Sequence, residues 1–70
     1  MSQINPMASI VHKHMYKSWI RENAELALER TEQFCREAKE LGMMLRYYED
    51  EHYVDIVAAY TEADLEKRYA

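Results

Sequence analysis

Seventy residues with a formal net charge of −4 and one cysteine restrict what this chain can be. A single cysteine excludes an intramolecular disulfide, and no apolar stretch has the length of a signal peptide or a membrane span, so we expect a cytoplasmic protein without membrane contact. The acidic balance argues against a nucleic-acid partner, because phosphate contacts need clustered Lys and Arg.

The first predicted element is one long helix over residues 6–41, which follows a frayed segment over residues 1–5. Asn5 is a suitable N-cap and Pro6 suits the first helical position, while Gly42 stands where the residue just past a helix end belongs. No other proline or glycine interrupts this stretch.

The second half of this helix carries a regular seam. From Ile20 onward, apolar and small side chains recur at alternating steps of four and three residues, which predicts a helix packed lengthwise against another element. The seam comprises Ile20, Ala24, Ala27, Thr31, Phe34, Ala38 and Leu41. A break in the helix near Ser18 or Asn23 is an alternative that the pattern leaves open.

The first half of this helix is bulkier and reaches beyond anything that the remaining residues can cover. A chain of this size usually needs a metal or a partner subunit when it has no disulfide, so we expect a homodimer or higher oligomer. The predicted self-association residues are Ile10, Val11, Met15, Tyr16, Trp19 and Ile20. Because Lys13, Lys17 and Arg21 precede an acidic remainder, an antiparallel arrangement is expected.

Residues 43–59 are predicted to form a β-hairpin, because Tyr, Val and Ile are concentrated there and alternate with other residues. With residues 50–51 at the tip, Tyr48 faces Tyr53 across the two strands. The same stretch also fits helical spacing. The alternative is therefore an all-α helical hairpin that dimerises.

A short helix over residues 61–69 is expected to follow, because Thr61 and Asp64 are spaced as in a capping box. The predicted fold class is α+β, mainly α: a long N-terminal helix, a β-hairpin and a short C-terminal helix, associating as a dimer. These elements form a single domain over residues 6–70. A two-stranded hairpin is unstable alone, so we expect it to lie on the helix seam.

The sequence offers little catalytic chemistry. On a helix, His12 and His14 would point about 200° apart, so a shared metal would require an extended backbone there. Structural zinc usually takes four Cys or His ligands, and the one cysteine and three histidines of this chain are scattered. Cys35 has no glycine-rich turn beside it to build an oxyanion hole. We therefore expect no enzyme, no metal and no cofactor.

The expected function is that of a small, homo-oligomeric, non-enzymatic interaction module that binds a partner protein and modulates its activity. Aromatic residues exceed what so small a core needs, and aromatics are typical interface anchors. The candidate partner-binding residues surround the acidic hairpin tip and are Tyr48, Glu49, Asp50, Glu51 and Tyr53. Plain chains of this size are common among phage and prophage accessory proteins.

Two other functions stay open at this point. A nucleic-acid-linked regulator would use Lys13, Lys17 and Arg21, which dimerisation would bring together with their copies. A structural or assembly subunit would instead use the long helix to build a larger bundle.

Overall fold

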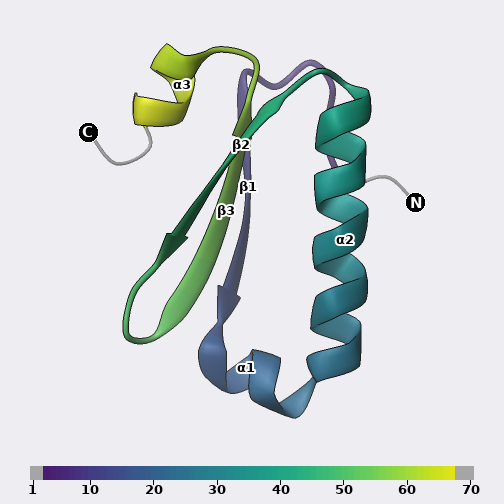
Figure 1. Cartoon of the computed structure of the whole chain (residues 1–70), viewed down its shortest axis with the longest axis vertical. Helices are drawn as coiled ribbons and strands as arrows, with labels where there is room; N and C mark the ends of the chain where they lie inside the picture. The colour runs from purple at the N-terminus through teal and green to yellow at the C-terminus, as the bar shows by residue number, and fades with distance from the viewer. Residues whose placement is uncertain (1–2, 68–70) are drawn as a thin grey trace.

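The computed structural model describes residues 3–67, which form a three-stranded antiparallel sheet and three helices. In chain order the elements are β1 (Ile10–Tyr16), α1 (Lys17–Glu22), α2 (Ala24–Glu40), β2 (Met44–Glu49), β3 (Tyr53–Ala59) and α3 (Glu62–Lys67). The strand order is β1-β3-β2, so β3 is central. Figure 1 shows α2 along one side of the sheet and α3 across from it, near the end of β3.

The predicted fold class, a mainly α chain that begins with one long helix, is wrong. Residues 10–16 are a strand that pairs with β3 along its whole length, from Ile10 opposite Ala59 to Tyr16 opposite Tyr53. This pairing supplies the third strand that a lone hairpin needs for stability. The molecule is a small α+β fold, with 45 % of the described residues in helices and 31 % in strands. The all-α helical hairpin is wrong for the same reason.

Residues 3–5, which belong to the segment predicted to fray, are anchored to the rest of the molecule or to the next turn. The backbone N–H groups of Gln3 and Ile4 donate to Oε1 of Glu37 at 2.9 and 3.2 Å. The side chain of Ile4 is buried in the core, with 3 % of its surface exposed. Asn5 caps a turn instead of a helix, since its side-chain oxygen accepts the N–H of Met7 at 3.0 Å.

The part of the predicted seam from Ala24 to Ala38 lies on α2, and its buried residues face the sheet, whereas Ile20 belongs to α1 and Leu41 follows the end of α2. Its residues Ala27, Phe34 and Ala38 are buried, and Phe34 packs in a cluster that includes Ile56 of β3. The helix break near Asn23 is present, because α1 ends and α2 begins there. The long helix of the prediction is therefore reduced to the 17 residues of α2, preceded by the single short helix α1.

The end of α2 follows the prediction for Gly42. This glycine has a φ of 82°, and its N–H donates to the carbonyl of Lys39 at 3.1 Å. The N–H of Met43 donates to the carbonyl of Ala38 at 2.8 Å. These two hydrogen bonds form a Schellman motif, which satisfies the last carbonyls of the helix and turns the chain toward β2.

Strands β2 and β3 form a hairpin inside the predicted range, but their register differs from the prediction by two residues. Tyr48 lies opposite Asp55 instead of Tyr53. Because the difference is an even number, every side chain keeps its predicted face. Asp50 supplies the turn in the absence of glycine, since its carboxylate accepts the N–H groups of His52 at 2.8 Å and Tyr53 at 3.2 Å. The N–H donors, His52 first, lower the pKa of Asp50.

The two faces of the sheet have different surroundings. We call the face toward α2 the inner face, which carries Val11, Lys13, Met15, Leu45, Tyr47, Glu49, Val54, Ile56 and Ala58. The outer face carries the alternate residues, and α3 covers one end of it, where Leu65 packs with Val57 and Ala59. Thr61 caps α3 by accepting the N–H of Asp64 at 3.2 Å. The last residues of the predicted C-terminal helix lie outside the described part of the chain.

No helix within residues 3–67 combines the length and the apolarity that crossing a membrane would require.

Candidate functional site

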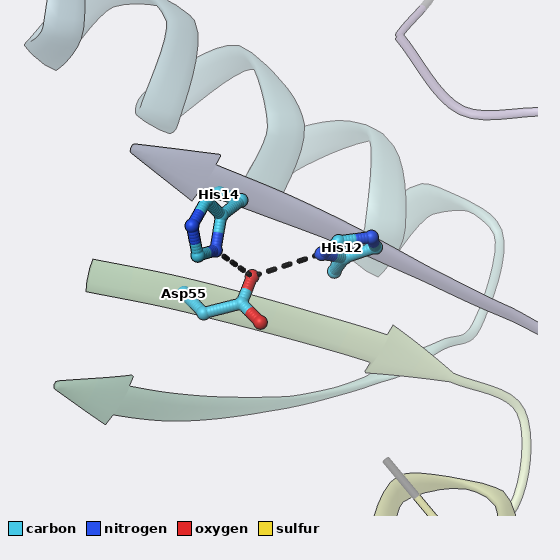
Figure 2. Close-up of side chains that lie close together, drawn as sticks. All are labelled: His12, His14 and Asp55. Carbon is cyan, nitrogen blue, oxygen red and sulfur yellow. Dashed lines mark hydrogen bonds and ion pairs between the residues drawn. The ribbon is translucent and has the colours of Figure 1, made fainter. Parts of the chain in front are cut away.

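The outer face holds a cluster of His12, His14 and Asp55, which we call the His–Asp–His cluster (Figure 2). The two histidines are two residues apart on β1, so their side chains share one face of the sheet. Asp55 lies on the central strand, opposite His14 in the register and diagonal to His12. The sheet therefore points all three side chains toward one place.

One carboxylate oxygen is common to both contacts in this cluster. Oδ1 of Asp55 lies 3.1 Å from Nδ1 of His12 and 3.9 Å from Nδ1 of His14. The Asp55 side chain is fully buried, whereas the His12 and His14 side chains are 42 % and 33 % exposed. The carboxylate is therefore the fixed inner member of the cluster, and the imidazole rings form its outer, adjustable edge.

Aromatic rings hold His14 in place. The ring centroid of His14 lies 4.5 Å from that of Tyr53 and 5.4 Å from that of Tyr16, the second pair being perpendicular. Tyr53 is the residue of β3 that pairs with Tyr16 at the end of β1. These contacts limit the rotation of the imidazole and keep its orientation toward Asp55.

Among the His, Cys, Asp and Glu residues within 3–67, these three form the group whose donor atoms lie close enough together to bind one metal ion. One ligand atom from each of the three residues lies within 4.8 Å of the other two. Sequence reasoning dismissed His12 and His14 because it placed them on a helix. The extended backbone of β1 removes that objection, and the signal that the sequence did offer is the two-residue spacing of the histidines, which places both side chains on one face of a strand.

A second feature lies on the other side of the sheet. A groove of about 340 Å³ opens between α2 and the inner face, and we call it the inner groove. Its lining is mainly apolar and includes Met15, Ile20, Leu28, Tyr47, Val54 and Ile56. Leu28 on α2 is 61 % exposed and Tyr47 on β2 is 58 % exposed, so a large apolar side chain stands in solvent on each side of the groove.

Charged groups fix the β2 side of the inner groove. Nζ of Lys17 lies 2.6 Å from Oε2 of Glu49, and the hydroxyl of Tyr47 donates to Oε1 of Glu49 at 3.0 Å. These two donors, Lys17 first, lower the pKa of Glu49. The hydrogen bond that the Tyr47 hydroxyl donates to Glu49 raises the pKa of that hydroxyl. Tyr47 is thereby held at the rim by its hydroxyl while its ring faces the groove.

The six predicted self-association residues do not form one surface. Ile10 lies on the outer face in the cluster around Leu65, whereas Val11 lies on the inner face. Met15 and Ile20 line the inner groove. The other two are Tyr16 and Trp19, of which Tyr16 is 58 % exposed and Trp19 lies 5.8 Å from the guanidinium of Arg30. The argument from an overlong helix no longer applies, so self-association stays a prediction.

The predicted partner-binding residues are also divided by the sheet. Tyr48 and Tyr53 belong to the outer face, and Glu49 lies at the rim of the inner groove. Asp50 and Glu51 lie in the turn between them. The hairpin tip is thus a turn ordered by Asp50, and it does not gather these five residues into one patch.

A scan against protein-family models and searches of curated proteins and of solved structures find no match to this chain. The two features described above therefore carry the functional argument.

Proposed function

We propose that this protein is a small non-enzymatic interaction module that binds an apolar segment of a partner protein in the inner groove. The observation that supports this proposal is the pair of exposed apolar side chains, Leu28 and Tyr47, on opposite sides of an apolar groove. Apolar surface that stands in solvent around a concave site is typical of protein-binding surfaces. The same groove, with Met15 and Ile20 in its lining, is where a second copy would bind if the chain self-associates.

The binding free energy would come from apolar surface of the groove that the chain itself leaves exposed. Burying a leucine side chain that was exposed contributes roughly 1.5–3 kcal/mol. A partner segment in the groove would cover both Leu28 and Tyr47 and gain a large share of its affinity from these two side chains. Such a concentration of binding energy in a few residues is usual at protein interfaces.

The test is a comparison of Leu28→Asp with Met7→Asp. Met7 is 88 % exposed and does not line the inner groove, so it is a matched apolar-to-acidic control. We expect the wild type and Met7→Asp to capture the same protein from host extract and to show the same concentration dependence in sedimentation velocity. Leu28→Asp should lower the affinity for that captured protein, or for a second copy of the chain, at least about tenfold, which corresponds to about 1.4 kcal/mol.

Equal behaviour of wild type and Leu28→Asp in both measurements would contradict the proposal. We expect circular dichroism to show that each variant keeps the fold, because Leu28 is exposed and its replacement leaves the buried seam of α2 intact.

Neither alternative function gains an observation in its favour. Two of the three basic residues of the regulator hypothesis are engaged within the chain, since Nζ of Lys13 donates to Oε1 of Gln3 at 2.8 Å and Lys17 pairs with Glu49. The assembly-subunit hypothesis required a long helix, and α2 has 17 residues.

A further inference from the structure

The outer face of the sheet carries chemistry that the proposed interaction function does not use. We propose that His12, His14 and Asp55 bind one divalent transition-metal ion of the class to which Zn²⁺ belongs. The three side chains come from two strands, lie on one face and already bring one donor atom each within 4.8 Å of the others.

The type of donor selects the class of metal. Two imidazole nitrogens and one carboxylate oxygen suit Zn²⁺, Cu²⁺ or Ni²⁺. Mg²⁺ and Ca²⁺ prefer sets made of oxygen ligands, and the cluster supplies oxygen from Asp55 alone. A zinc ion held by three protein ligands keeps a fourth position for water or another ligand.

Two of the three donor-atom separations are close to those of a metal centre, and the third, between the two histidines, is at most 4.8 Å. Zinc bonds of about 2.0–2.2 Å in a tetrahedral site place neighbouring ligand atoms about 3.3 Å apart. The distances from Oδ1 of Asp55, 3.1 Å to His12 and 3.9 Å to His14, lie on either side of that value. The His12 ring is the more exposed of the two, so a change in its side-chain torsions would close most of the remaining distance while Asp55 and the packed His14 ring stay in place.

The surroundings also suit a metal site. The buried carboxylate favours a cation beside it, because the interior lowers the effective dielectric constant. The packing of the His14 ring against Tyr16 and Tyr53 orients one ligand in advance, as the surroundings of metal-bound histidines commonly do. The ligands join β1 at the edge of the sheet to the central strand β3. A bound ion would therefore act as the staple that a chain of this size otherwise lacks.

The experiment is a titration of the full chain with Zn²⁺ by isothermal calorimetry near neutral pH, where protons compete with the metal for histidine less than they do in acid. We expect one Zn²⁺ per chain and no binding of Mg²⁺ at the same concentrations. His12→Gln and His14→Gln should each weaken Zn²⁺ binding by at least tenfold. His52→Gln is the matched control, since His52 lies exposed in the hairpin turn outside the cluster and its replacement should leave the affinity unchanged.

A second measurement avoids any loss of fold in the variants. In the wild type, Zn²⁺ should shift the imidazole nitrogen resonances of His12 and His14 and leave those of His52 unchanged. No binding up to high micromolar Zn²⁺, or shifts centred on His52 or Cys35, would overturn the proposal and leave the cluster as a hydrogen bond between Asp55 and His12 with His14 beside it. Leu28→Asp, on the opposite side of the sheet, should bind Zn²⁺ as the wild type does, so the two proposals fail independently.

Discussion

Asp55 is the residue that gives the outer face its character. A fully buried carboxylate on a central strand is costly unless charged or hydrogen-bonding groups surround it. The register places His14 opposite it on one side and Tyr48 on the other, and His12 approaches it along the diagonal. The two histidines of β1 therefore provide polar neighbours for the buried carboxylate of β3, a role that the sequence of β1 alone does not reveal.

Gly42 allows a sharp test at the same scale. A Cβ built at this position meets nothing within 4 Å, so Gly42→Ala introduces no steric clash. The φ of 82° nevertheless lies in the left-handed region, which costs a residue with a Cβ about 1–2 kcal/mol. We expect Gly42→Ala to lower the free energy of unfolding by about that amount in urea denaturation.

Gly42→Asn separates the backbone cost from any other effect. Asparagine tolerates the left-handed conformation better than alanine does, so its loss should be smaller than that of Gly42→Ala. Equal losses for the two variants would show that the glycine acts through something other than its φ.

At the scale of elements, the hairpin turn depends on one carboxylate. The N–H groups of His52 and Tyr53 donate to Asp50 and lower its pKa below the ordinary value of 3.8. A group whose pKa is lowered by folding stabilises the fold above its ordinary pKa and loses that contribution as the pH falls through the lowered value. The stabilisation by Asp50 should therefore be complete above about pH 4 to 5 and decline below pH 3.8.

The measurement is the difference in unfolding free energy between wild type and Asp50→Ala as a function of pH. That difference should be constant near neutral pH and shrink in acid. Glu51→Ala, in the same turn, is the control that removes a carboxylate which does not accept these two hydrogen bonds. A difference for Asp50→Ala that does not change between neutral and acid pH would mean that its carboxylate does not hold the turn.

The elements differ in whether neighbouring residues in the sequence are enough to predict them. The seam of α2 and the glycine at its end are local signals, and both could be predicted. Strand β1 could not, because Tyr16 passes directly into α1 at Lys17 without a proline or glycine to mark the change. Its conformation is set by pairing with β3, which lies some forty residues further along the chain. The His–Asp–His cluster was missed for the same reason, since it exists only in that register.

At the scale of the whole molecule, the sheet separates two surfaces with different properties. The inner face is covered by α2 along the seam and opens as an apolar groove at one end. The outer face is covered by α3 at one end and carries the His–Asp–His cluster beyond it. The proposed partner groove and the proposed metal site therefore lie on opposite sides of the sheet, so occupation of one would leave the other accessible.

This arrangement predicts an uneven distribution of local stability. In β3, both neighbouring strands and both faces protect the chain, and Val57, Ala58 and Ala59 are completely buried. In α1, by contrast, no residue is buried. Segments with few buried contacts open locally at much lower free energy than the core does.

We expect hydrogen exchange followed by NMR to show amides near Val57 exchanging at least about tenfold more slowly than those of α1, a difference of about 1.4 kcal/mol or more in opening free energy. Equal protection in the two elements would mean that the molecule opens only as a whole, and that α1 is held by contacts stronger than its exposure indicates.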